Sequence, residues 1–428
     1  MQLSSLNRDV LMSKLTSENF IYLILFLFPI FGVTMRHWIS SNFVLLGLSS
    51  LYLYKYHIKN GRKLSKEERV LLWGFAAYFG VFVITALVNG WEYQQTKHLG
   101  IEIRYLFFIP IYLVVRNLPQ SKRYLFMGSM LAVFVAGVDV LMYLSIDGGG
   151  VYHADGYRYM GAYSPLLVGP VILLFAVICI SDLESNQRTR GSIFLIIAML
   201  CITLLITEES SARIAILASL ILFSFLIYFV FDGLLRVVVF VVLSLLISFS
   251  VVFVEPISKR VDIVKDEISQ YSKMENSGAV NEPLGSVQLR LEMWRATKYF
   301  FNDSAIFGVG LGNYSEAVKK YIDKKLVHPG IGMHSHPHNV YSEMLISRGI
   351  FGVIVFLWIT ILPLSYFISS YAQGNRHAFT GILFILSFLI FSLTEASTFT
   401  KGNFSSLYIV FLAVLFSDIL TTNIDKQE

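Results

Sequence analysis

Long runs of apolar residues follow one another along most of this chain, and short polar or charged segments separate them. A helix needs roughly 20 apolar residues to cross the hydrocarbon core of a bilayer, and most of the runs approach that length. The pattern therefore predicts an all-α polytopic integral membrane protein with about twelve transmembrane helices. Their approximate bounds are 19–34, 42–56, 70–89, 103–116, 124–145, 162–181, 192–208, 211–231, 235–254, 338–370, 378–395 and 405–421.

The first and tenth runs need separate treatment. The chain is polar up to about Glu18, and no small-residue cleavage site follows the first run, so we expect a retained helix rather than a signal peptide. The tenth run is too long for a simple span. We expect it to begin outside the bilayer and to enter near Gly349.

Basic residues gather in alternate short loops, which predicts the orientation because Lys and Arg accumulate on the cytoplasmic side. Both termini are therefore expected in the cytoplasm, with the long loop 255–337 on the periplasmic side of a Gram-negative inner membrane. The chain divides into nine helices (1–254), this loop, and three helices (338–428). The basic residues are Lys55, Lys59, Arg62, Lys63, Lys66 and Arg69, then Arg116, Lys122 and Arg123, then Arg188 and Arg190.

Composition agrees with a membrane protein and excludes other classes. Hydrophobic residues make up 55% of the chain, charged residues only 15%, and the mean hydropathy is +0.63. A soluble protein has about a quarter charged residues. The net charge of +5 gives no ground for a nucleic-acid partner. Cys179 and Cys201 fall inside apolar runs, which indicates small core residues rather than a disulfide or a zinc pair.

The long loop contains two amphipathic segments. Residues 257–271 and 286–301 are predicted helices, residues 276–285 form a turn between them, and Ser286 is the expected N-cap of the second helix. On that helix, Arg290 shares one face with Trp294 and Thr297, so its guanidinium either binds a ligand or is solvated. The neighbouring apolar stripe consists of Leu289, Met293, Ala296 and Phe300.

Two further residues stand where chemistry is favoured. Arg213 follows Ser-Ser-Ala at the outer end of the eighth run, where a cation either faces a polar cavity or serves as an interface anchor. His338 lies at the mouth of the predicted bundle, and an imidazole there suits a general base. Asn339 and Glu343 lie on nearby turns and are candidates to orient it.

Three alternating histidines, His334, His336 and His338, also permit a zinc or copper site. Pro337 interrupts the pattern, and the adjacent sequence offers no cysteine or carboxylate to complete a shell, so we expect no metal. No cofactor is expected either. The chain has no Asp-X-Asp pair for a metal–diphosphate clamp, and arginine can replace such a clamp because it binds phosphate oxygens through two donors.

The glycines of Gly-Val-Gly-Leu-Gly, residues 308–312, follow a loop helix rather than a strand. A dinucleotide-binding turn needs a preceding strand, so that interpretation fails. A tight turn, or a close backbone approach to the membrane helices, is the simpler explanation.

The segment from His338 to Gly352 reads His-Asn, nine residues, Gly, two residues, Gly. It resembles the signature of the O-antigen ligase and polymerase superfamily of bacterial membrane glycosyltransferases. Arg290, Trp294 and the glycine run stand upstream as in that family, Ser-Ala-Arg at 211–213 also fits, and the stretch from Arg158 to Pro165 fits more weakly. The likeness covers roughly the last two-thirds of the chain.

The resemblance implies twelve spans in a GT-C-type glycosyltransferase architecture with a large periplasmic loop. It further implies inverting, metal-independent transfer of a glycan from undecaprenyl diphosphate to an acceptor hydroxyl. Loop and chain length favour an O-antigen ligase acting on lipid A-core in lipopolysaccharide synthesis. A polymerase of the same superfamily is the alternative, and a lipid-linked glycan transporter is the second. Against the transporter, charges concentrate at one outer face, and no paired Gly/Pro-interrupted spans are visible.

Roles follow from the same resemblance. Arg213 and Arg290 would stabilise the leaving diphosphate, and His338 would accept the proton of the hydroxyl. Weaker candidates for binding donor or glycan are Arg158, Tyr159, Asn339, Trp294, Lys97 and Arg104.

Overall fold

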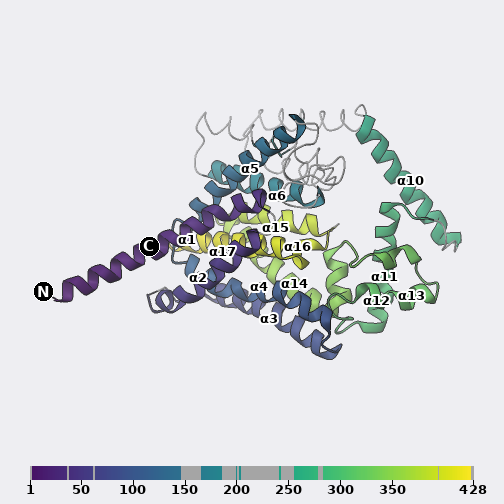
Figure 1. Cartoon of the computed structure of the whole chain (residues 1–428), viewed down its shortest axis with the longest axis horizontal. Coiled ribbons are helices and arrows are strands. Elements are labelled where there is room, and N and C mark those ends of the chain that lie inside the picture. The colour runs from purple at the N-terminus through teal and green to yellow at the C-terminus, as the bar shows by residue number, and fades with distance from the viewer. Residues whose placement is uncertain are drawn as a thin grey trace.

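The structure, a computed structural model, describes residues 2–35, 38–60, 63–145, 165–185, 255–277, 283–393 and 395–425, with a few isolated positions between 199 and 241. These described residues form helices and no strand (Figure 1). The longer helices are α1 (Gln2–Thr34), α2 (Trp38–Asn60), α3 (Lys66–Val88), α4 (Tyr93–Val115), α5 (Ser121–Ser145), α6 (Pro165–Ser185), α10 (Glu255–Ser277), α11 (Ser286–Ser304), α14 (Val340–Ala372), α15 (Ala378–Ser392) and α17 (Gly402–Asp425). The short ones are α12 (Tyr314–Ala317), α13 (Lys319–Asp323), the 3₁₀ helix η1 (Pro329–Met333) and α16 (Ser397–Thr400).

Six helices in the described part of the chain are long and apolar enough to cross a membrane. The apolar parts of α6 and α15 are shorter. The prediction of a multi-pass, all-helical membrane protein is thus confirmed. The count of twelve stays a prediction, because the expected spans 192–208, 211–231 and 235–254 lie almost entirely outside the described residues.

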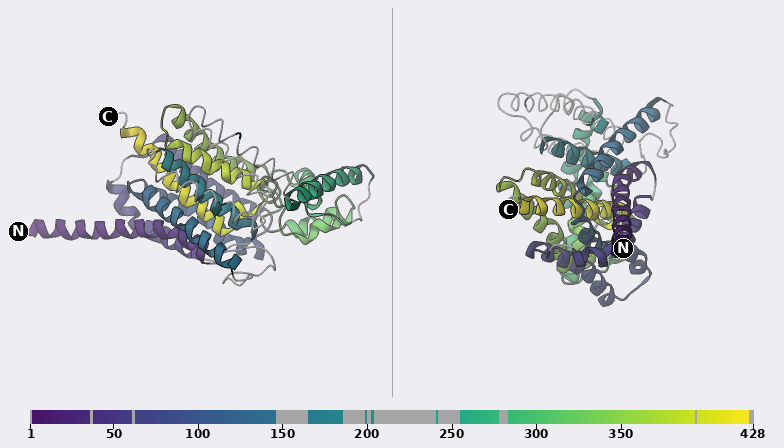
Figure 2. Two further views of the ribbon diagram at one scale, coloured as in Figure 1. Left: turned by 90° about the horizontal axis from the view of Figure 1, so that it is seen from above. Right: turned by 90° about the vertical axis from the view of Figure 1, so that its left-hand side faces the viewer.

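The helix α17 forms the centre of the bundle. Every side chain from Phe404 to Ser417 is buried, as expected for a helix that is apolar on all sides. It packs against α4, α2 and α15, while α1 packs against α5 and α14 against α3. Figure 2 shows α10 to α13 gathered at one end of the bundle, whereas the start of α1 and the end of α17 lie at the opposite end. Both termini therefore lie away from the long loop.

The loop helices form a second, smaller core. Met293, Ala296 and Phe300 of α11 are buried, as the apolar stripe predicted, and they pack with Tyr314 and Tyr321. The expected cap Ser286 is wrong by one residue, because Gly285 is the N-cap of α11. The physical reason is that α10 caps this helix from outside: Glu267 Oε2 accepts the backbone N–H of Val287 at 2.7 Å.

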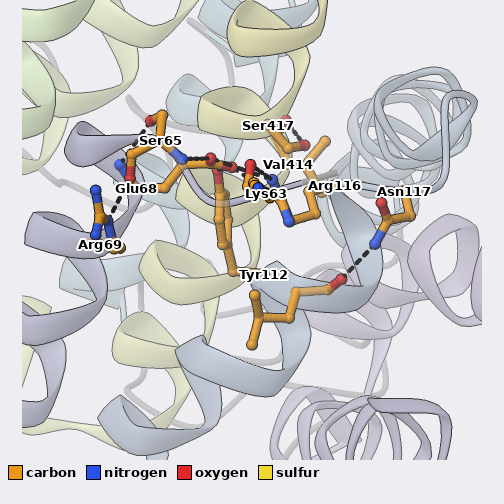
Figure 3. Close-up of polar contacts among 10 residues, drawn as sticks. Lys63, Ser65, Glu68, Arg69, Tyr112, Arg116, Asn117, Val414 and Ser417 are labelled. Carbon is orange, nitrogen blue, oxygen red and sulfur yellow. Dashed lines mark hydrogen bonds and ion pairs between the residues drawn. The ribbon is translucent and has the colours of Figure 1, made fainter. Parts of the chain in front are cut away.

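A buried ion pair joins the start of α3 to the end of α4 (Figure 3). Ser65 and Glu68 form a capping box at the start of α3, and the same carboxylate receives Arg116 from the end of α4. Arg116 Nε donates to Glu68 Oε1 at 2.9 Å, Nη2 donates to Oε2 at 3.2 Å, and the Tyr112 hydroxyl donates to Oε1 at 2.7 Å. The side chain of Glu68 is 0% exposed, so it depends on these donors.

Replacing Arg116 with leucine is expected to lower the stability of the bundle by about 3–5 kcal/mol, because a buried carboxylate would lose its cation. Thermal unfolding in detergent measures this. Arg69→Ala is the matched control, since Arg69 is exposed and makes only a 3.4 Å contact to the Ser65 carbonyl oxygen. An equal loss of stability in both variants would contradict the assignment.

Candidate functional site

The helix α14 is kinked at Gly349, the residue near which we expected the chain to enter the bilayer. This glycine has a φ of +63° inside α14. The glycine run lies directly against it: Val309 N–H donates to the Ile346 carbonyl oxygen at 2.8 Å, and Gly310 N–H donates to that of Ser347 at 3.0 Å. The predicted close backbone approach is confirmed. It fixes the first two turns of α14, and with them the segment that precedes Val340.

The three alternating histidines come together in that segment. The ring of His338 lies 4.4 Å from that of His336 and 5.4 Å from that of His334, between centroids. His338 has a φ of +51°, a left-handed conformation that is uncommon outside glycine and is found at functional sites. Its backbone N–H donates to His336 Nδ1 at 3.3 Å, which ties the His336 ring to the backbone of His338.

Trp294 and Asn339 support this segment. Trp294 Nε1 donates to the Pro337 carbonyl oxygen at 3.3 Å, which ties α11 to the residue before His338. Asn339 is the N-cap of α14, where its Oδ1 accepts the N–H of Ser342 at 2.9 Å and its Nδ2 donates to the Leu393 carbonyl oxygen at 2.8 Å. Both residues were expected to contact substrate. In the structure their polar atoms hold the backbone on either side of His338.

A carboxylate that the sequence did not single out faces His338. Glu395, in the connection between α15 and α16, places Oε2 3.7 Å from His338 Nδ1. The expected orienting carboxylate was Glu343, and that expectation is wrong. Glu343 is 4% exposed and lies under the electrostatic influence of Arg348 and Glu102 inside the bundle. Only the folding of α15 against α14 brings Glu395 to the site, 57 residues after His338 in the sequence.

Two cations influence the histidine segment. Burial, His338 and the guanidinium of Arg290 lower the pKa of His334. Burial, His338 and Lys401 lower the pKa of His336 to about 4, although Glu395 opposes them. Both rings are therefore neutral near pH 7. Arg290 forms no hydrogen bond or ion pair with the residues that the structure describes.

The other candidate cations have different surroundings. Arg104 Nη1 donates to the Gly402 carbonyl oxygen at 2.5 Å and to the hydroxyls of Ser406 and Ser40, next to Lys401. Lys97 is exposed near the start of α4, one residue before His98, whose ring lies against Gly312. The remaining candidates Arg213, Arg158 and Tyr159 lie outside the described residues.

One ion pair is completely buried between two helices of the bundle. Arg348 Nη2 donates to Glu102 Oε1 at 2.7 Å, and both side chains are 0% exposed. The guanidinium also lies 4.6 Å from the centre of the Tyr78 ring. The pair joins α4 to α14 immediately before Gly349. It therefore anchors the same turn of α14 that the glycine run contacts.

The donor set beside His338 fits a metal poorly. Ligand atoms of His336, His338 and Glu395 lie within 4.8 Å of one another, so folding supplies the carboxylate that the adjacent sequence lacked. His336 Nδ1, however, accepts the N–H of His338, so the proton of this neutral ring is on Nε2. Neither nitrogen then offers the free lone pair that a metal ligand needs.

Comparisons with known proteins agree with the resemblance seen in the sequence. The family model described as O-antigen ligase matches residues 193–357, a range that contains Arg213, Arg290 and His338. An uncharacterized protein of Haemophilus influenzae is 21% identical over 369 residues, which are 83% of this chain and 88% of that protein. The matched range ends beyond Gly352 and includes the glycine run and the first turns of α14.

Proposed function

We propose that this chain is an O-antigen ligase, because the family model described as O-antigen ligase matches residues 193–357 and members of that family are membrane glycosyltransferase-like enzymes. It transfers a polysaccharide from undecaprenyl diphosphate to a hydroxyl of lipid A-core at the periplasmic face of the inner membrane. The observation that carries the proposal is the placement of His338 at the junction of loop and bundle, with Arg290 and Lys401 near its two histidine neighbours.

The proposed step is an inverting substitution. The acceptor oxygen attacks the anomeric carbon, the bond from that carbon to the phosphate oxygen breaks, and undecaprenyl diphosphate leaves with both electrons of the bond. His338 accepts the proton of the acceptor hydroxyl. Arg290 and Arg213 stabilise the negative charge that develops on the diphosphate, and such a donor typically contributes about 3 kcal/mol in a water-poor site.

Lys401 adds a cation that sequence reasoning missed. It lies at the end of α16, close enough to His336 to lower the pKa of that ring, and its side chain is exposed. We assign it to the diphosphate together with Arg290. Arg104 donates to the carbonyl oxygen of Gly402, the residue after Lys401. We therefore assign Arg104 to positioning Lys401 and not to contacting the donor.

Further parts of the proposal concern the bound glycan and the architecture. Arg158 and Tyr159 contact the glycan or the second phosphate, and Lys97 contacts the donor from the start of α4. The protein has twelve GT-C-like spans with both termini in the cytoplasm. The buried pair Arg348–Glu102 weakens the argument from charge placement against a lipid-linked glycan transporter, so the test below includes that function.

A deletion strain tests the function, because ligase, polymerase and transporter leave different products. Loss of a ligase is expected to leave unmodified core, with lipid-linked polymer accumulating on the periplasmic face. Core carrying a single repeat would identify a polymerase instead. Purified protein in proteoliposomes, given undecaprenyl-diphosphate glycan and lipid A-core, should form the conjugate; movement of the donor across the bilayer without conjugate would identify a transporter.

A further inference from the structure

The surroundings of Glu395 fix its carboxylate toward His338. Oε1 accepts the backbone N–H of Ser397 at 3.0 Å and the Ser397 hydroxyl at 2.6 Å. These two donors leave Oε2 directed at His338 Nδ1, 3.7 Å away. Nδ1 is buried and has no hydrogen-bond partner among the described residues, so the carboxylate is the nearest acceptor to complete its bonding.

The carboxylate is ionised near neutral pH. Burial raises the pKa of Glu395, but the nearby imidazole of His338 and the two donors of Ser397 outweigh burial and hold that pKa at about 2. An ionised carboxylate only accepts hydrogen bonds. A separation of 3.7 Å is longer than a hydrogen bond, and such contacts in unliganded sites commonly shorten when substrate binds.

We propose that Glu395 is a positioning residue, which holds the proton of neutral His338 on Nδ1 and thereby leaves the lone pair of Nε2 free to accept the proton of the acceptor hydroxyl. The inference rests on the proposed general-base role of His338. When the imidazolium forms, its positive charge lies beside the Glu395 carboxylate, which stabilises it. The geometry is that of a carboxylate orienting a basic imidazole, a recurring device in catalysis.

The amide variant Glu395→Gln provides a sharp test, because it exchanges an acceptor for a donor. The glutamine carbonyl oxygen still accepts both Ser397 donors, which places the NH₂ group toward His338. Nδ1 must then accept, so the proton moves to Nε2 and the base is lost. The variant is expected to lower the turnover rate about 100-fold or more, with little change in the KM for the donor.

The alanine variant distinguishes positioning from a structural role. Glu395→Ala removes the anchor of Ser397 but lets His338 adopt either tautomer. If Glu395 only anchors the turn at Ser397, the alanine variant is the more damaging and the glutamine variant is nearly silent. If Glu395 positions the base, the glutamine variant is at least as damaging as the alanine variant. Glu316→Gln, on the exposed face of α12, is the control, and wild-type turnover is expected.

The pH profile gives an independent readout. The acid limb of the pH–rate profile is expected to lie at lower pH in Glu395→Ala than in the wild type, because the variant has no carboxylate to stabilise a positive charge on the base. The other groups around His338 are the neutral rings of His334 and His336 and the cations Arg290 and Lys401, which both variants keep. An unmoved profile would overturn the proposal.

A double variant separates this inference from the function on which it rests. If His338→Ala is inactive while Glu395→Gln keeps full turnover, the inference fails and the function stands. If His338→Ala is itself active, the general-base function fails. The expected result is that His338→Ala combined with Glu395→Gln is no slower than His338→Ala alone, because both changes remove the same proton acceptor.

Discussion

Replacing His338 with alanine is expected to lower the rate of glycan transfer by about 10² to 10⁴, the usual contribution of a general base. The imidazole lies at the junction of loop and bundle, and the backbone N–H of His338 donates to His336 Nδ1. Because that contact uses the backbone, the alanine variant keeps it. Initial rates with purified donor and lipid A-core measure the loss.

A matched control is available in the same segment. His334 is also half-buried, and its ring lies 5.4 Å from that of His338, but it faces no carboxylate in the described residues. His334→Ala is expected to keep the rate within about threefold, since its ring has no proton to transfer in the proposed step. Wild-type turnover in His338→Ala, with normal expression, would contradict the proposed mechanism.

Replacing Gly349 with alanine is expected to detach the loop from α14 and abolish activity. An added Cβ would lie 2.3 Å from the Ile306 carbonyl oxygen and 2.6 Å from that of Ala305, both backbone atoms. A left-handed conformation costs a non-glycine residue roughly 1–2 kcal/mol, and overpacking adds about 1–3 kcal/mol. Thermal unfolding, followed by a transfer assay at low temperature, measures both consequences.

Gly374 separates the two contributions. Its φ is +87°, also left-handed, but an added Cβ would meet nothing within 4 Å. Gly374→Ala is therefore expected to cost only the backbone strain and to keep activity. If the two alanine variants unfold at the same temperature, the contact between Gly349 and residues 305–306 contributes nothing to the fold.

The sequence predicted the membrane helices well where apolar runs were long. The run 338–370 became α14, Val340–Ala372, and the break at Gly349 fell where a polar start gave way to apolar residues. The stripe on α11 was also correct, because helical periodicity reports directly which face is buried. His338 and Arg290 were chosen from residue type, spacing and the family resemblance, and their roles stay predictions.

Contacts between distant segments could not be predicted. Glu395 follows an apolar run and resembles an ordinary residue at a helix end, and its meeting with His338 depends on how α15 packs against α14. Lys401 is similar. Ser286 was chosen as a cap because the local sequence did not reveal that Glu267 of another helix supplies the acceptor. Local patterns predict helices, whereas tertiary packing decides which polar groups meet.

The pairing of Glu102 with Arg348 has a consequence for biosynthesis, since 246 residues separate the partners. At about 5–20 residues per second, a ribosome needs roughly 10–50 s to add the arginine after the glutamate. During that interval Glu102 has no basic partner in α14, and an unpaired charge on a membrane helix is costly. The ion pair between α4 and α14 can therefore form only after residue 348 has been added, so we expect a nascent chain cut short before that residue to leave Glu102 without it.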